Sequence, residues 1–200
     1  MMIQRILYII ALFLMPALSQ AQNEVAPLKK VEWSVNVFGN PETNFSKNTK
    51  YATNSGYQLK YIIYPMSHKN TRFGLGFGFE RLNTSMIDTF SIHENRIPLL
   101  ASVKFSSREN ELFYAKLELG SAVVFDSEKH LNNGNKETNH RSDVGAPILI
   151  SGSIGMTLIH RPDKYNIGIE LGYAYKQYGY KQVTEYNANA VVFGIFAALP

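Results

Sequence analysis

The chain has 200 residues, no cysteine and a formal net charge of +4 at pH 7. Its length predicts a single domain, and the lack of cysteine excludes a disulfide framework, a thiolate metal site and a cysteine nucleophile. The basic residues are scattered along the chain, which argues against nucleic-acid binding, because such proteins gather Lys and Arg on one face.

The first 21 residues have the three parts of a secretory signal peptide. Arg5 supplies a positive charge, residues 6–15 form an apolar run, and residues 19–21 (Ser-Gln-Ala) make a small-x-small cleavage site. The run is shorter than the roughly 20 residues of a membrane helix; an uncleaved anchor and a buried core helix are the alternatives. We predict cleavage near Ala21 and a mature domain over residues 22–200. The net charge then falls from +4 to +3, because Arg5 is the only charged residue removed.

Eight stretches of the mature chain alternate between apolar and other residues, the pattern of a β-strand with one apolar face. In the first stretch, Val31, Trp33, Val35 and Val37 alternate with polar residues. The last stretch is the weakest, because alanine stands in both phases. The predicted strands are residues 31–37, 57–63, 73–80, 96–105, 113–120, 148–158, 165–176 and 190–199.

The connections between these strands alternate between long and short. The short ones contain turn-forming residues such as Pro65, Asn70 and Ser106. Outer-membrane barrels have long extracellular loops, short periplasmic turns and an even number of strands. We therefore predict an all-β fold, an eight-stranded antiparallel up-and-down transmembrane β-barrel in the cell outer membrane, with both termini periplasmic. The long connections are residues 39–53, 82–92, 126–145 and 177–187; the short ones are 65–70, 106–110 and 161–164.

Alternation alone does not say which face points outward. A soluble periplasmic ligand-binding barrel would place the bulky apolar phase inside. Here the opposite phase is mostly Gly, Ala and Ser with a few charges, which suits the narrow interior of an eight-stranded barrel. Gly74, Gly76 and Gly78 would make room in the lumen for long side chains opposite. Aromatic residues beside the short turns, such as Phe105 and Phe113, match the aromatic girdles of membrane barrels.

Two short stretches carry a resemblance to a known family: residues 96–100 (Arg-Ile-Pro-Leu-Leu) and residues 169–173 (Ile-Glu-Leu-Gly-Tyr). With the pattern of strands and connections, they make the chain resemble the small outer-membrane β-barrel proteins of Bacteroidota, similar in plan to the OmpX/OmpA-type and PorT-like barrels. The resemblance covers nearly all of the mature chain and implies contact with the barrel-insertion machinery. Such barrels usually end on an aromatic residue, whereas this chain ends Ala-Leu-Pro at residues 198–200. Either Phe196 serves as the aromatic residue that the insertion machinery reads, or the insertion signal departs from that of the family.

Ionisable residues fall on the inner phase of the predicted strands. Four are acidic and five are basic, and this near-balance predicts paired charges that plug the lumen, because an unpaired buried charge is costly. Lys60 and Glu80, on adjacent strands, are a predicted pair. The alternative is that these charges line a narrow ion channel, or form a gate that opens when the charged residues exchange ion-pair partners. The predicted lumen network comprises Glu32, Lys60, Glu80, Arg96, Lys104, Lys116, Glu118, Glu170 and Lys176.

Catalytic, cofactor and metal sites have little support. The five histidines are dispersed, with no HExxH or HxH spacing, so no metal site and no cofactor are predicted. Some eight-stranded barrels are lipid A-modifying enzymes that use a His and a Ser near the lipid-facing surface. His160 is predicted on the outer phase at the periplasmic end, with no serine beside it. We predict that the protein is not an enzyme; the enzyme alternative requires a cluster of His, Ser and acidic groups on the outer surface.

The longest connection, residues 126–145, is the candidate binding surface, because loops on a rigid barrel are where binding resides. Lys129, Lys136 and Arg141 are predicted to contact lipopolysaccharide phosphates or an extracellular partner; a solvated loop is the alternative. The predicted role is structural or adhesive, or that of an accessory to an envelope complex such as a secretion apparatus. The expected partners are outer-membrane lipid, lipopolysaccharide, the barrel-insertion machinery and an envelope protein.

Overall fold

The computed structural model describes residues 30–40, 52–68, 70–86, 90–106, 112–131, 136–139, 147–161, 164–177 and 187–200. The predicted signal peptide and its cleavage site lie outside these residues. The elements found in the described ranges are β-strands. The same ranges contain no helix that is long and apolar enough to cross a membrane.

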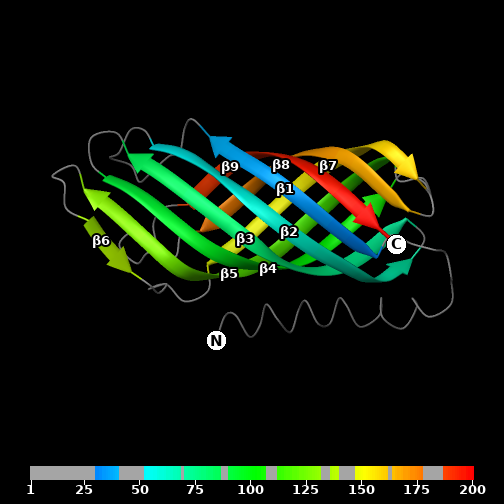
Figure 1. Ribbon diagram of the computed structural model, residues 1–200, viewed down its shortest axis with the longest axis horizontal. Helices are drawn as coiled ribbons and strands as arrows, with labels where there is room; N and C mark the ends of the chain where they lie inside the picture. Colours follow the sequence, from blue (N-terminus) through cyan, green and yellow to red (C-terminus); the bar gives the residue numbers. More distant parts are fainter. Residues whose placement is uncertain are drawn as a thin grey trace.

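The strands form a closed antiparallel barrel (Figure 1). Consecutive strands of the wall pair with each other, and β1 pairs with β9, which closes the sheet. The short β6 pairs with the end of β5, so the wall itself has eight strands and the predicted fold class is confirmed. The strands are β1 (Val31–Asn40), β2 (Ala52–His68), β3 (Thr71–Met86), β4 (Phe90–Ser106), β5 (Phe113–Leu131), β6 (Lys136–Asn139), β7 (Ile148–Arg161), β8 (Tyr165–Gln177) and β9 (Asn187–Leu199).

The two ends of the barrel differ. The chain enters β1 and leaves β9 at the same end, where β2 joins β3, β4 joins β5 and β7 joins β8 through short connections. We call this the turn end and the opposite end the loop end.

Strands β3, β4 and β5 continue toward the loop end beyond their predicted limits. β3 runs to Met86 and β4 begins at Phe90, so the predicted connection 82–92 is mostly strand and that boundary was wrong. β5 runs to Leu131, into the predicted loop 126–145. The outward-facing residues there are polar, so the alternation of apolar residues stops before the strand does.

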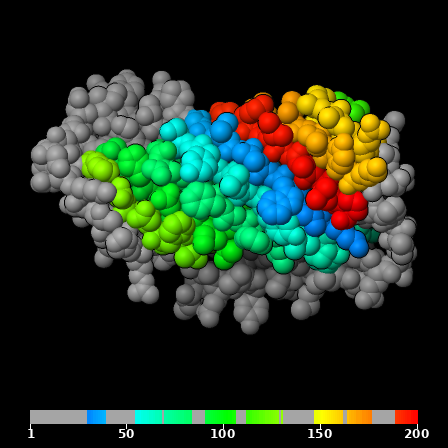
Figure 2. Space-filling view, in the orientation of Figure 1, coloured from blue at the N-terminus to red at the C-terminus, as the bar shows by residue number. Residues whose placement is uncertain are grey.

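The bulky apolar side chains point outward around the barrel. Trp33 is 54% exposed, Leu75 63% and Ile154 65%, whereas Ser34, next to Trp33, is buried. Figure 2 shows one side of this surface, where side chains of neighbouring strands form a continuous cover. A soluble ligand-binding barrel needs the reverse arrangement, so that alternative was wrong.

A β-bulge in β7 changes the position predicted for His160. The pairing with β8 shifts between Thr157 and Ile159, and His160 then pairs with Asn166. Asn166 is an inward-facing, buried residue, and its Oδ1 lies 2.9 Å from His160 Nδ1. The prediction of an outward His160 was wrong because the extra residue of a bulge inverts the phase of the strand beyond it.

Candidate functional site

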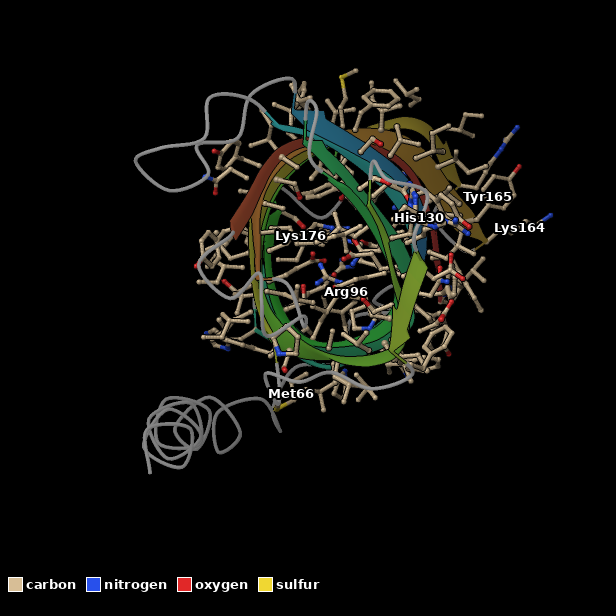
Figure 3. The ribbon with its side chains drawn as sticks, turned by 90° about the vertical axis from the view of Figure 1, so that its left-hand side faces the viewer. Met66, Arg96, His130, Lys164, Tyr165 and Lys176 are labelled. Atoms are coloured by element: carbon tan, nitrogen blue, oxygen red, sulfur yellow. The ribbon has the colours of Figure 1, made fainter. Side chains whose placement is uncertain are left out.

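Two networks of paired charges fill the barrel interior. Figure 3, a view along the barrel, shows Arg96 and Lys176 inside the ring of strands and His130 and Tyr165 on its outer side. Each network draws its members from three or more strands, so most of the partners that meet in space are distant in sequence. The turn-side network consists of Glu32, Lys60, Lys104, Lys116, Glu118 and Glu170, and the loop-side network of Glu80, Glu94, Arg96 and Lys176.

Lys116 lies at the centre of the turn-side network. Its Nζ is 2.9 Å from Glu32 Oε1 and 2.6 Å from Glu170 Oε2. The same Nζ is 3.6 Å from Glu118 Oε1. Glu32 also accepts a hydrogen bond of 2.7 Å from Lys104. Because β1 and β5 lie on opposite sides of the ring, the Glu32–Lys116 pair joins opposite walls of the barrel.

Lys60 completes the turn-side network from β2. Its ammonium donates to both carboxylate oxygens of Glu118, at 2.9 and 2.8 Å, and its Nζ lies 3.8 Å from Glu170. Hydroxyl groups supply further donors: Ser151 donates to Glu118 at 2.8 Å, and Tyr114 donates to Glu170 at 3.0 Å. Each of these two carboxylates therefore has both charged and neutral partners.

Glu80 is the shared acceptor of the loop-side network. Its carboxylate pairs with the Arg96 guanidinium and with Lys176 Nζ, the latter at 2.5 Å. Arg96 also lies 4.0 Å from Glu94. The Lys176 ammonium sits 3.5 Å from the centroid of the Phe38 ring, in a cation–π contact. Because β3 and β8 are on opposite sides of the ring, the Glu80–Lys176 pair is a second link between opposite walls.

Each network is electrically neutral by itself. The turn-side network has three carboxylates and three ammonium groups, and the loop-side network has two carboxylates and two cations. All ten side chains are at most 5% exposed. An unpaired buried charge is strongly unfavourable. Because the positive and negative charges are equal in number, charged side chains can fill the interior without leaving a charge unpaired.

The structure places all nine residues of the predicted lumen network inside the barrel. The predicted Lys60–Glu80 pair was wrong: Lys60 is opposite Gly78 in the sheet and pairs with Glu118, while Glu80 pairs with Arg96 and Lys176. Glu94, which was not among the predicted members, stands two residues before Arg96 on the same face of β4. The predicted strand began at residue 96, which left Glu94 out.

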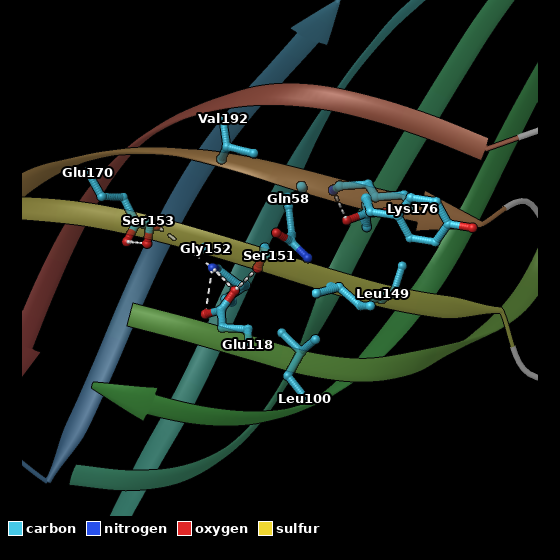
Figure 4. Close-up of a pocket in the computed structure, with 15 residues that line it drawn as sticks. Gln58, Leu100, Glu118, Leu149, Ser151, Gly152, Ser153, Glu170, Lys176 and Val192 are labelled. Carbon is cyan, nitrogen blue, oxygen red and sulfur yellow. Dashed lines mark hydrogen bonds and ion pairs between the residues drawn. The ribbon is translucent and has the colours of Figure 1, made fainter. Parts of the chain in front are cut away.

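A small cavity lies between the two networks (Figure 4). Its volume is about 20 Å³, which is room for about one water molecule. A channel would need a continuous gap along the lumen, whereas the Glu32–Lys116 and Glu80–Lys176 pairs cross it from wall to wall. The geometry of the described residues therefore favours a plugged interior.

Aromatic rings pack beside the turn-side network. The rings of Tyr114 and Phe196 meet edge to face with centroids 5.1 Å apart, and Lys104 Nζ lies 4.0 Å from the centroid of Tyr114. These rings need glycine opposite them: a Cβ at Gly155 would overlap the Tyr114 ring, and one at Gly168 the Phe196 ring. Phe196 is thus buried inside the barrel. This is the residue named above as a possible substitute for the terminal aromatic residue of the family.

Replacing Gly155 by Ala is expected to destabilise the barrel by about 1–3 kcal/mol, the usual cost of overpacking a core. The new methyl group would overlap the Tyr114 ring, which is also held by its hydrogen bond to Glu170. Urea titration of the refolded barrel measures the loss. In a Tyr114→Leu background the same substitution should cost much less; an equal cost in both backgrounds would contradict this contact.

A polar cluster lies on the outer face at the loop end. It contains Ser91 and His93 of β4 and Glu128 and His130 of β5; Ser91 is directly opposite His130, and His93 is opposite Glu128. His130 Nε2 lies 3.3 Å from Glu128 Oε2, and the two imidazole centroids are 5.4 Å apart. The cluster was not predicted from the sequence, because the predicted strand 96–105 begins after Ser91 and His93 and the predicted strand 113–120 ends before Glu128. In the described ranges, no three His, Cys, Asp or Glu side chains are arranged to hold a metal ion.

The predicted loop-binding residues fall at the limit of the described structure. Lys129 belongs to β5 and Lys136 to β6, and for both only the backbone is described. Arg141 lies outside the described residues. Their contact with lipopolysaccharide or a protein partner stays a prediction.

Solved structures share this architecture. Neisserial surface protein A aligns with 86% of this chain and 97% of its own, at 8% identity and a TM-score of 0.51. The attachment invasion locus protein Ail of Yersinia pestis covers 86% of this chain and 99% of its own, at 11% identity and a TM-score of 0.46. The translocator domain of the autotransporter NalP from Neisseria meningitidis covers 98% and 97%, at 9% identity and a TM-score of 0.38. No protein-family model matches the sequence, and no curated protein does. The likeness to neisserial surface protein A supports the barrel fold alone.

Proposed function

We propose that the protein is an integral outer-membrane barrel with a closed lumen. The observation that carries the proposal is the inversion of polarity: apolar side chains are exposed around the wall, while ten charged side chains are buried inside in neutral networks. In water this arrangement would expose a large apolar surface, which soluble monomers avoid. In a bilayer the exposed apolar side chains would face lipid, and the closed sheet meets the requirement that backbone polar groups be paired within the protein.

The proposed role is that of a rigid scaffold, structural or adhesive, or an accessory of an envelope complex such as a secretion apparatus. A lumen braced by ion pairs supports the scaffold role over transport. The loop end carries the polar extensions of β3, β4 and β5 together with β6. We propose that this end faces outward and contacts lipopolysaccharide or an envelope protein, and that the turn end faces the periplasm.

Heat-modifiability tests this location. Washed outer-membrane fractions are run on a semi-native gel with and without boiling, and the folded barrel should migrate at a different position from the boiled chain. The same purified barrel in a planar bilayer should carry no stepwise current if the lumen is closed. Recovery in the soluble periplasmic fraction without a mobility shift would contradict the proposal.

Substitution of Ile154 by Arg tests the lipid-facing surface directly. Ile154 is 65% exposed on β7, and its neighbour Gly155 faces inward. A cation at the bilayer midplane of a barrel costs about 2–4 kcal/mol, so we expect Ile154→Arg to lower the free energy of unfolding in lipid vesicles by that amount. Ile154→Leu, which preserves volume and polarity, is the matched control. Equal stability of the two variants would place this residue outside the membrane.

Ester hydrolysis on the outer face is the second candidate function. The specific observation is that Ser91 lies directly opposite His130, which is 3.3 Å from Glu128. Directly opposed residues in a sheet have Cβ atoms about 4.5–5.5 Å apart. A serine beside a histidine that is held by a carboxylate can attack an acyl ester, because the imidazole accepts the hydroxyl proton.

The enzyme candidate is tested with the refolded barrel and a p-nitrophenyl ester in mixed micelles. Release of p-nitrophenol should disappear in Ser91→Ala and His130→Gln and persist in the turn-end controls Ser67→Ala and His68→Gln. A wild-type barrel that is folded but no faster than empty micelles would eliminate this candidate and leave the scaffold role.

A further inference from the structure

The two charge networks meet at the central cavity (Figure 4). Lys60, Glu118 and Glu170 of the turn-side network line it, together with Glu80 and Lys176 of the loop-side network. Among the described residues, the ion pairs of Lys60, Lys116 and Lys176 lie within their own networks. The cavity is therefore where a bridging group would connect them.

The size of the cavity limits what it holds. Its volume is about 20 Å³, and a buried water needs about 10–15 Å³ together with two to four polar partners. One water fits, whereas an organic ligand does not. The lining supplies ammonium donors and carboxylate acceptors within the same small space.

Gln58 provides a second reason to expect a bound molecule. Its side chain lines the cavity and is 7% exposed. The amide has two N–H donors and a carbonyl acceptor, yet no side-chain hydrogen bond of Gln58 is found among the described residues. Buried polar side chains have partners in the great majority of folded proteins, and a water both donates and accepts.

A bound ion is the alternative occupant. Each network is already neutral, with as many carboxylates as cations among members that are at most 5% exposed. An ion would add an unpaired charge to this interior, which is unfavourable. A neutral molecule with both donor and acceptor capacity fits the lining better.

We infer that one water molecule occupies this cavity, hydrogen-bonds to the Gln58 amide and links the turn-side and loop-side networks. Leu100, Leu149 and Val192 also line the cavity, so part of its wall is apolar and the polar partners of the water lie on the remaining sides. The inference concerns the lumen alone, so it does not depend on which membrane holds the barrel.

The test is magnetic resonance of the mature chain refolded in deuterated micelles. Nuclear Overhauser cross-peaks are recorded between the water resonance and the side-chain amide protons of Gln58. A direct cross-peak of the sign expected for a slowly tumbling complex supports a bound water. Its absence from the spectrum of a folded wild-type barrel would overturn the inference.

Filling the cavity gives an independent check. Ala174 lines the cavity and is buried, so Ala174→Val should displace the water and abolish the Gln58 cross-peak. The matched control is Ala115→Val on the exposed face of β5, which should retain it. Survival of the cross-peak in Ala174→Val would count against this cavity as the water site. A heat-dependent mobility shift is measured on the same samples. It shows whether a missing cross-peak comes from a folded barrel with a dry cavity or from a chain that has not folded.

Discussion

Replacing Lys116 by Met is expected to cause the largest loss of stability of any single substitution in the lumen. The change leaves the three carboxylates of the turn-side network with two ammonium groups, in a region that is at most 5% exposed. Removing one partner of a buried ion pair costs about 3–5 kcal/mol. Lys116 contacts three carboxylates, so we expect a decrease of at least that size in the free energy of unfolding, measured by urea titration in lipid vesicles.

The control for this experiment is Lys164→Met. Lys164 is exposed at the turn end, and substitutions of such residues usually change stability by no more than about 0.5 kcal/mol. If Lys116→Met and Lys164→Met were equally stable, the turn-side network would not contribute to the stability of the barrel. A Lys116→Arg variant shows whether a positive charge alone is sufficient for the stability of the barrel, because it retains the cation with a different shape.

A double-mutant cycle on Lys60 and Glu118 is expected to reveal the second large effect. Either Lys60→Met or Glu118→Gln leaves a buried partner without its closest counter-charge, at a cost of about 3–5 kcal/mol. The double variant removes both charges, so it should lose considerably less than the sum of the single losses. Unfolding free energies of the four proteins give the coupling.

The same cycle on Lys60 and Glu80 is the matched comparison. These residues lie on adjacent strands but belong to different networks. Because Lys60 pairs with Glu118 whereas Glu80 pairs with Arg96 and Lys176, the coupling between Lys60 and Glu80 should be much smaller than that between Lys60 and Glu118. Strong coupling between Lys60 and Glu80, with additivity between Lys60 and Glu118, would reverse the assignment of partners described above.

The inward and outward faces of the strands were predictable from sequence. A strand side chain alternates between two faces, so Trp33 and Ser34 must lie on opposite sides whatever the register. Which inward charges meet was not predictable, because contacts across the lumen depend on strand order and stagger around the ring. Lys60 reaches Glu118 on β5, three strands away, and not Glu80 on the neighbouring β3.

Departures from regular alternation explain the other errors. The bulge in β7 adds one residue between Thr157 and Ile159 and turns His160 toward Asn166. The position of this bulge cannot be recognised in the sequence, because Leu158 and Ile159 are both apolar and either could be the outward-facing residue. At the loop end, polar residues occupy the outer face of β4 and β5, so the strands look like loops in the sequence. The cluster around Ser91 and His130 could be seen only once the strand pairing was known.

The links between opposite walls also bear on how the barrel assembles. The partners in Glu32–Lys116 and Glu80–Lys176 are 84 and 96 residues apart in sequence. They cannot meet while the chain is a row of hairpins, and they come together only when the sheet has curved and β1 approaches β9. Contacts that form after the transition state slow unfolding and leave the folding rate nearly unchanged. If these contacts form after the transition state, Lys116→Met should refold at nearly the rate of the wild type and unfold much faster, which stopped-flow refolding and unfolding measurements would check.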